Sequence, residues 1–165
     1  MSNGFQRAEY LKKQKIFASM GNDCFWQPHI VPPEAELIKM NNNVVVASEV
    51  LFVTHDVIHY VLRKVDPDSH FSLNLGAIEI GDNVFIGNRS TILPDTIIGD
   101  RVIIGAGSLV KGKIESNSVY VGIPARKIGN FDSVIETRKS QIESKRVKSE
   151  RYDETWELFN KKFGK

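Results

Sequence analysis

The sequence has little of several features that would assign a class at once. Its 165 residues include one cysteine, so no intramolecular disulfide can form and a cytoplasmic protein is expected. No apolar run approaches the ~18 residues that a membrane-spanning helix needs, and residues 1–7 lack the apolar core of a signal peptide. The formal net charge is only +2, which gives no reason to expect nucleic acid or a membrane surface as a partner.

The composition is otherwise ordinary for a folded domain. Hydrophobic residues make up 41% and charged residues 25%, which excludes wholesale disorder. A chain of 165 residues has the length of one domain and can bury a core of its own. Composition therefore predicts a single soluble domain and indicates nothing about its activity.

A six-residue repeat begins at Ile80 and predicts the fold. The successive units are IGDNVF, IGNRST, ILPDTI, IGDRVI, IGAGSL and VKGKIE, each with an aliphatic first residue. Residues 80–90 align on residues 98–108, eighteen positions later, with seven identities in eleven. This pattern predicts a solenoid whose triangular coils stack Ile80 under Ile98 at a spacing of about 4.8 Å. The glycine in second place is expected to allow the positive φ of a sharp corner. An antiparallel sandwich would instead show two-residue alternation.

The repeat also predicts where the solenoid lies in the chain. Residues 1–21 are expected to form an N-terminal helix or arm. The solenoid is expected over residues 22–128, because the six-residue register already holds at Ile38, Val44 and Val50.

Two segments do not follow the register. Residues 56–77 are predicted to form a loop that leaves the solenoid, which is a usual place for function. Residues 129–165 are predicted to form a helical extension. Trp156, Phe159 and Phe163 share one helix face there, and we expect them to cover an end of the solenoid or to pack in an oligomer.

The repeat resembles that of the hexapeptide-repeat acyltransferases, whose fold is a left-handed parallel β-helix. The resemblance spans about residues 22–128 and includes the stretch from Gly122 to Arg126 (GIPAR), which is similar to the family's G-x-P-A-[KR] motif. It implies an all-β solenoid with left-handed coils, an excursion loop and flanking helices, against the usual right-handed crossover. It also implies a homotrimer whose active sites lie between subunits.

His55 is the predicted catalytic base. The run His55-Asp-Val-Ile-His59-Tyr-Val-Leu-Arg63 is similar to one in the galactoside branch of that family, where a histidine follows a strand and precedes a loop. A sugar hydroxyl is too weak an acid to attack a thioester at neutral pH, and an imidazole with a pKa near ~6.5 can accept its proton. Asp56 and Glu49 are both close enough in sequence to orient His55, and the sequence does not choose between them.

Other parts of the site follow from the resemblance. Asn88 stands where the family often has serine, and its backbone N–H is expected to stabilise the oxyanion. Tyr60 and Arg63 in the loop are candidate contacts for the acceptor. Cys24, the competing nucleophile, lies outside the family's motif and is expected to be inert.

The resemblance implies acetyl-CoA as cosubstrate and no metal. The family lays the pantetheine arm against small residues, which match residues 104–108 (IGAGS) here. The candidate coenzyme contacts are Ala106, Ser108, Lys111, Lys113, Arg126 and Lys127. The basic residues among them suit the phosphates of the coenzyme.

The predicted function is an acetyl-CoA-dependent O-acetyltransferase that acts on a hydroxyl of a sugar or glycan. Neighbouring branches acylate amino sugars or antibiotics, so N-acetylation stays open. A γ-carbonic-anhydrase-like metalloenzyme is a second hypothesis, but it uses a His-x4-His pair, whereas His55 and His59 have three residues between them. A solenoid without catalysis is a third hypothesis, against which His55, Gly122 and Arg126 argue.

Overall fold

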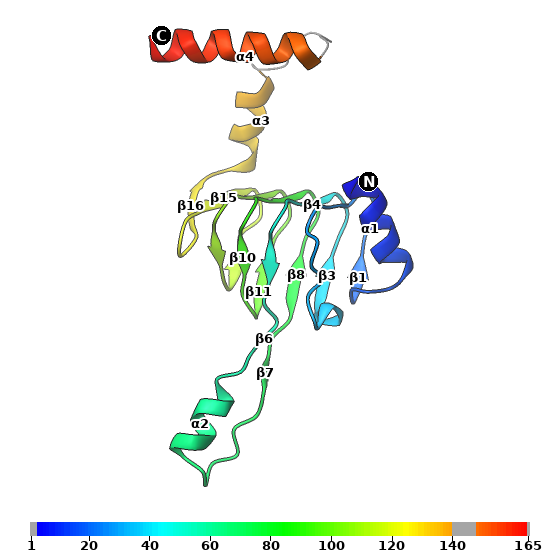
Figure 1. Ribbon diagram of the computed structural model, residues 1–165, viewed down its shortest axis with the longest axis vertical. Helices are drawn as coiled ribbons and strands as arrows, with labels where there is room; N and C mark the ends of the chain where they lie inside the picture. Colours follow the sequence, from blue (N-terminus) through cyan, green and yellow to red (C-terminus); the bar gives the residue numbers. More distant parts are fainter. Residues whose placement is uncertain (1–2, 140–147, 165) are drawn as a thin grey trace. The chain divides into compact units, whose positions relative to one another are not determined.

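The computed structural model describes residues 3–139 and 148–164 of the chain. The chain divides into two compact units, Met1–Ser133 and Val134–Lys165. All the strands that the structure describes belong to the first unit, where Figure 1 shows them stacked side by side. None of the helices in the described ranges is both long and apolar enough to cross a membrane.

Three sheets make up most of the first unit. The first sheet contains β1 (Ser19–Met20), β3 (Ile38–Met40), β8 (Ile78–Ile80), β11 (Thr96–Ile98) and β14 (Lys113–Ile114). The second contains β2 (Phe25–Trp26), β4 (Val44–Val46), β9 (Val84–Ile86), β12 (Val102–Ile104), β15 (Ser118–Val121) and β16 (Arg126–Gly129). The third contains β5 (Leu51–Phe52), β10 (Thr91–Ile92) and β13 (Leu109–Val110).

The chain visits the three sheets in rotation, and the pairing confirms the eighteen-residue period. The strands β8, β9 and β10 belong to the first, second and third sheet, and β11, β12 and β13 repeat that order. Ile80 pairs in parallel with Ile98, and Ile86 pairs with Ile104. The predicted stacking of equivalent aliphatic residues is therefore correct. Only β16 pairs antiparallel within these sheets, on β15.

The aliphatic first residues of the repeats form the core. Their side chains are no more than 1% exposed and comprise Ile80, Ile86, Ile92, Ile98, Ile104 and Val110. Burial of one such side chain stabilises a protein by about 1.5–3 kcal/mol, so each repeat adds to the hydrophobic core. The early coils use the same positions, since Ile38 and Val44 are fully buried.

The glycines in second place are required for a reason other than the predicted one. Positive φ occurs at the fourth residue of the repeats, for example 59° at Arg89 and 57° at Arg101. Gly87, in second place, lies so close to the next coil that an added Cβ would be 2.5 Å from the backbone nitrogen of Ala106. These glycines therefore allow two coils to approach each other, and the prediction of a positive φ at them is wrong.

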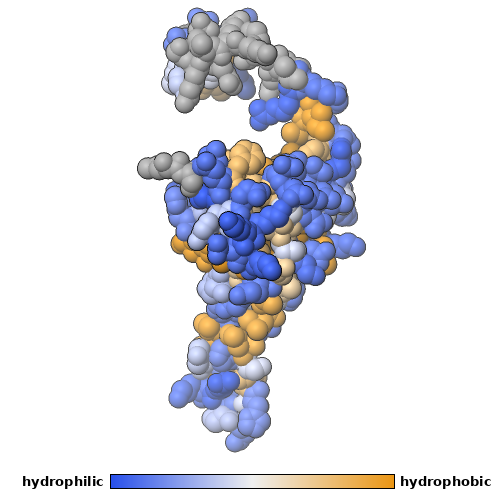
Figure 2. All heavy atoms as spheres, turned by 90° about the vertical axis from the view of Figure 1, so that its right-hand side faces the viewer, coloured by the Kyte–Doolittle hydropathy of each residue, from blue (hydrophilic) through white to orange (hydrophobic). Residues whose placement is uncertain are grey.

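The excursion from the coil is an ordered arm. We define the arm as residues 55–75, which contain β6 (His55–Asp56), α2 (His59–Val65) and β7 (Asn74–Leu75). The strands β6 and β7 pair antiparallel, and the arm projects away from the sheets (Figure 1). Figure 2 shows hydrophobic residues on the part of the arm nearest the sheets, where Val57, Ile58 and Leu75 are 49–57% exposed.

Helices flank the strands in the sequence. The helix α1 (Gly4–Lys13) begins with a capping box formed by Asn3 and Gln6, and it buries Ala8 and Leu11 at the first coil. A 3-10 helix, η1 (Ala35–Leu37), precedes β3. After the last coil, α3 (Phe131–Lys139) begins where Asp132 pairs with Arg101.

The second unit contains α4 (Lys148–Phe163). The ring centroids of Trp156 and Phe159 are 5.6 Å apart, and those of Phe159 and Phe163 are 4.8 Å apart, so the three rings follow one face. The partner of this face stays a prediction.

Candidate active site

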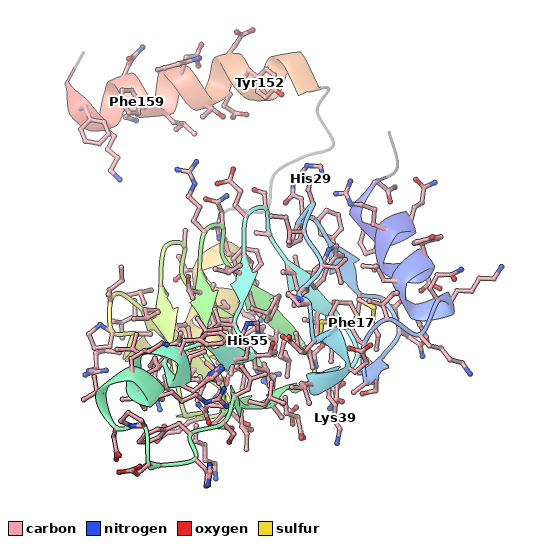
Figure 3. The ribbon with its side chains drawn as sticks, turned by 60° about the horizontal axis from the view of Figure 1, so that its bottom comes forward. Phe17, His29, Lys39, His55, Tyr152 and Phe159 are labelled. Carbon is pink, nitrogen blue, oxygen red and sulfur yellow. The ribbon has the colours of Figure 1, made fainter. Side chains whose placement is uncertain are left out.

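His55 is held where the arm leaves the third sheet. The residues before it continue β5, whose Leu51 pairs with Thr91 of β10. His55 itself pairs with Leu75, and the backbone N–H of Gly76 donates to the carbonyl of Thr54 over 2.8 Å. Figure 3 shows the His55 ring at the base of the arm. The chain is therefore paired with β10 before His55 and with β7 at His55, while the His55 side chain remains 31% exposed.

Glu34 is the hydrogen-bond partner of His55. Its Oε2 lies 2.7 Å from Nδ1 of His55, and the hydroxyl of Thr54 donates to the same oxygen over 2.6 Å. The hydrogen bond from Thr54 and, next, that from His55 lower the pKa of the Glu34 carboxyl below its ordinary value.

This contact sets the tautomer of His55. A carboxylate can only accept, so Nδ1 of His55 carries the proton and donates it to Glu34. The lone pair of the neutral ring then lies on Nε2. The arrangement presents a proton acceptor at Nε2 with a ring whose orientation is fixed by the carboxylate.

Neither candidate from the sequence orients His55. The carboxylate of Asp56 accepts from the backbone N–H of Ile58 and from Nδ2 of Asn74, each over 3.0 Å, and it joins β6 to β7. Glu49 instead pairs with Arg89 over 2.5 Å. Sequence reasoning missed Glu34 because it lies 21 residues before His55, in a coil where prolines interrupt the repeat.

Asn88 lies at a corner of the coil. Its Nδ2 donates to the carbonyl and hydroxyl oxygens of Ser48, over 3.0 and 2.8 Å. Asn88 precedes β10, whereas His55 follows β5, and these strands pair side by side. The two residues therefore lie at opposite ends of the third sheet, and one chain does not bring them together.

The predicted coenzyme corner stacks on Asn88. The backbone N–H of Gly107 donates to the carbonyl of Asn88 over 2.8 Å, and Ala106 beside it is exposed. Ser108 is only 2% exposed, and its hydroxyl donates to the carbonyl of Gly105 over 2.6 Å. The hydroxyl of Ser108 is therefore buried and hydrogen-bonded within the corner, which argues against the predicted contact with coenzyme.

Basic side chains lie near the same corner. The carbonyl of Leu109 accepts from the N–H of Ala125 over 2.9 Å, which brings the exposed Arg126 beside residues 105–109. Lys127 pairs with Glu115 over 2.8 Å, and this contact raises the pKa of Lys127 and lowers that of Glu115.

Lys111 and Lys113 follow the corner and are both exposed. An exposed ammonium group can contact a phosphate without the loss of a buried partner. Their placement is therefore compatible with the predicted coenzyme contacts.

The predicted acceptor residues lie on the arm. Arg63 donates from Nε to the carbonyl of Phe71 over 2.6 Å, so it fastens α2 to the returning chain. Tyr60 is 64% exposed, and its ring lies 4.2 Å from that of His59. His59 is buried, and its Nδ1 has no hydrogen-bond partner among the residues that the structure describes.

Comparison with known sequences places the chain among proteins with the same repeat. Residues 77–112 match the family model described as bacterial transferase hexapeptide (six repeats). The chain is 40% identical over 92 residues to galactoside O-acetyltransferase of Escherichia coli, a match that covers 55% of this chain and 43% of that protein. It is 38% identical over 125 residues to protein CapG of Staphylococcus aureus, a match that covers 74% of this chain and 71% of that protein. The chain spans about half the length of two curated relatives that it matches.

Solved structures share the fold. A maltose O-acetyltransferase from Clostridium difficile 630 has a TM-score of 0.56 at 24% identity, over 77% of this chain and 86% of that one. AntD, an N-acyltransferase from Bacillus cereus in complex with dTDP and 3-hydroxybutyryl-CoA, has a TM-score of 0.51 at 21% identity. This match covers 84% of this chain and 96% of that one. Because the CapG match covers most of both proteins, the chain belongs to the hexapeptide-repeat transferase family.

Proposed function

We propose that the protein is an acetyl-CoA-dependent O-acetyltransferase that acts on a hydroxyl of a sugar or glycan. The observation that carries this proposal is the 2.7 Å contact between Nδ1 of His55 and Oε2 of Glu34. It leaves Nε2 as a proton acceptor at a partly exposed position, which is what attack by a hydroxyl on a thioester requires.

The transfer proceeds directly from the thioester to the acceptor. As the acceptor oxygen bonds to the thioester carbonyl carbon, its proton passes to Nε2 of His55. The imidazolium is stabilised by the Glu34 carboxylate. Collapse of the tetrahedral intermediate breaks the C–S bond, and the proton on Nε2 passes to the departing thiolate. The products are the acetyl ester and free coenzyme, and His55 is neutral again.

The oxyanion and the coenzyme are placed at the corner formed by Asn88 and Ala106. The backbone N–H of Asn88 stabilises the oxyanion, and the exposed Ala106 and Gly107 allow the pantetheine arm to lie against the backbone. Arg126 is close enough to this corner to contact the coenzyme phosphates. The acetyl-CoA supplies the activated acyl group, and the chain supplies the base and the donors.

The active site is completed by a second subunit. His55 and Asn88 lie at opposite ends of the third sheet, so one chain alone cannot direct both at one thioester. A homotrimer of left-handed coils, as the family resemblance implies, brings His55 of one subunit toward the Asn88 corner of another. We place this enzyme in the cytoplasm, where acetyl-CoA is available.

N-acylation of an amino sugar is the second candidate. Its support is the 40% identity over 70 residues to dTDP-4-amino-4,6-dideoxy-D-glucose acyltransferase of Escherichia coli. An amine that is already neutral needs a base less than a hydroxyl does. The two candidates therefore differ in how far the rate depends on His55.

The test is release of coenzyme thiol from acetyl-CoA in the presence of a panel of sugars and amino sugars. We expect turnover with a hydroxyl acceptor, and we expect His55→Ala to lower kcat by about 100-fold or more while the affinity for acetyl-CoA is retained. Near-normal turnover of His55→Ala with a hydroxyl acceptor would remove His55 as the base. Turnover with amines alone would favour the second candidate.

A further inference from the structure

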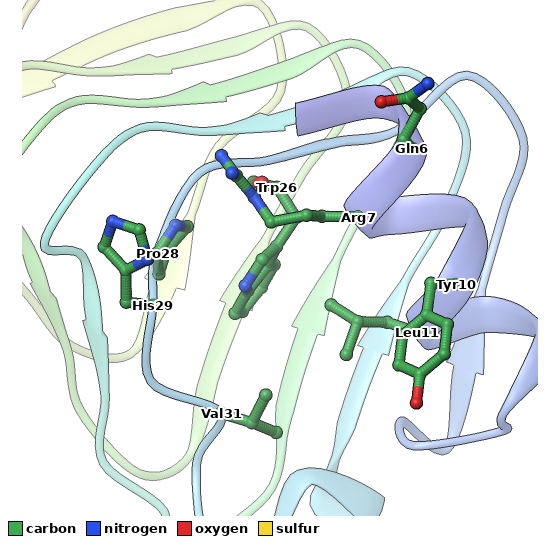
Figure 4. A pocket seen from close by; sticks show the side chains of 8 residues that line it. All are labelled: Gln6, Arg7, Tyr10, Leu11, Trp26, Pro28, His29 and Val31. Carbon is green, nitrogen blue, oxygen red and sulfur yellow. Dashed lines mark hydrogen bonds between the residues drawn. The ribbon is translucent and has the colours of Figure 1, made fainter. Parts of the chain in front are cut away.

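Two hollows beside residues 28–33 have no role in the transfer described above. The first lies between α1 and the first coil and has a volume of about 450 Å³. Figure 4 shows Arg7 extending from α1 toward Pro28 and His29, and Gln6, Tyr10 and Val31 are also among the lining residues. The second hollow has a volume of about 320 Å³. Each falls within or near the size range of small-molecule sites.

The two hollows are neighbours, and the second reaches residues close in sequence to Glu34 and His55. Pro28 and His29 line both of them. The second hollow is also lined by Pro33, which precedes Glu34, and by Phe52, which lies three residues before His55. A ligand that contacts the first hollow and reaches the His55–Glu34 pair therefore extends along residues 28–33, which more than one sugar unit can do.

The lining of the first hollow suits a sugar ring. Its floor is apolar and contains Leu11 and the buried Trp26. Tyr10, whose side chain is 63% exposed, offers an aromatic face on which the C–H face of a pyranose can pack. The imidazole of His29 and the hydroxyl of Tyr10 can exchange hydrogen bonds with sugar hydroxyls.

We propose that these two hollows bind the units of a glycan acceptor beyond the unit that is acetylated. The acceptor is then an extended chain rather than a free monosaccharide. This inference rests on the proposed function, because it assumes that the acetylated unit lies at His55.

Binding measurements separate this inference from the transfer reaction. We would titrate the full chain with glucose and maltotetraose, and with galacturonic acid and tetragalacturonic acid, by calorimetry. At least one tetrasaccharide should bind about tenfold or more tightly than its monosaccharide. Tyr10→Ala and His29→Ala should each weaken that tetrasaccharide about five- to tenfold, which corresponds to loss of one ring or hydrogen-bond contact. Tyr10→Phe should retain most of the affinity.

The controls distinguish a binding role from a structural one. Lys39→Ala changes an exposed residue of β3 and should leave all affinities unchanged. A lack of tetrasaccharide binding, or equal affinity for both lengths, would overturn the inference. A change of oligomeric mass in Tyr10→Ala or His29→Ala would also overturn the inference. It would show that this surface contacts a second copy of the chain instead of a glycan.

The same experiment keeps the two proposals apart. Binding of a tetrasaccharide through Tyr10 without any acetyl transfer would contradict the proposed function and support the glycan site. Acetyl transfer to monosaccharides with no dependence on chain length would support the function and overturn the glycan site.

Discussion

His55 and Glu34 interact through a single carboxylate oxygen that also accepts from Thr54. Thr54 is 1% exposed, so its hydroxyl is fixed and keeps Oε2 directed at the ring. A hydrogen bond to a charged group is stronger than one between neutral groups, so the carboxylate favours the tautomer of the imidazole that donates from Nδ1. In the proposed reaction, Glu34 is therefore a positioning residue and His55 is the residue that contacts the reacting atoms.

Replacement of Glu34 tests this division of roles. Glu34→Gln removes the charge that stabilises the imidazolium and releases the ring from one tautomer, so kcat should fall about 10- to 100-fold. The KM for acetyl-CoA should not change. Steady-state kinetics of Glu34→Gln beside Glu136→Gln, a matched carboxylate of α3 paired with Lys139, measures the effect. An equal loss in both variants would contradict the positioning role.

The pH dependence of stability tests the charge on Glu34. Its pKa in the folded protein lies below the ordinary value of 4.5. The stabilisation from this carboxylate is therefore present above about pH 4.5 and is lost as the pH falls through the lowered folded pKa. Urea denaturation between pH 7 and pH 3 should give a difference in free energy of unfolding between wild type and Glu34→Gln. This difference should become smaller as the pH approaches 3. A difference in free energy of unfolding that stays constant over this pH range would contradict a stabilising role of the ionised Glu34 carboxylate.

At the scale of the element, the corners of the coil depend on contact between neighbouring turns. Gly87 has no room for a Cβ, because the backbone nitrogen of Ala106 would lie 2.5 Å from it. Gly107 has a φ of 69°, but nothing lies within 4 Å of its added Cβ. Other repeats have arginine at the place of Gly107, such as Arg89 and Arg101 with φ near 60°.

The two glycines should therefore respond differently to alanine. Gly87→Ala should lower the free energy of unfolding by about 1–3 kcal/mol, because backbone must move to admit the methyl group. Gly107→Ala should cost about 1 kcal/mol or less, because only the left-handed conformation is penalised. Urea denaturation of both variants provides the comparison. Equal costs would show that close approach does not set the glycine requirement.

At the scale of the whole molecule, the placement of His55 and Asn88 determines how many chains a site needs. They belong to opposite ends of one sheet, and the arm beside His55 exposes apolar residues such as Val57 and Ile58. An exposed apolar surface of this kind is typical of an interface between chains. Both features support an oligomer whose sites are shared.

Complementation between two inactive variants tests shared sites. His55→Ala removes the base, and Ala106→Trp blocks the coenzyme corner. Each variant alone should lose about 100-fold or more of its activity. Mixed oligomers, purified through two different tags, should regain part of the activity, because some sites combine an intact His55 with an intact Ala106. No recovery in the mixed oligomers would place both residues in one chain's own site.

Much of the fold follows from local pattern. Aliphatic residues at every sixth place specify the core and the period, since Ile80, Ile86 and Ile98 need only a neighbouring coil to bury them. The departure of the arm near residue 56 also follows, because the register fails there. The helix α2 inside the arm could not be predicted from the pattern, because its apolar residues are exposed and show no single buried face.

The sequence by itself determined the repeat, the coils and the place of His55, because those depend on residues close together in the chain. Only the tertiary structure decided the partner of His55. Glu34 reaches it across 21 residues, through a coil that prolines make irregular, and no local spacing encodes that contact. The tertiary structure also separated His55 from Asn88, because the distance between them depends on how the strands of the third sheet pair.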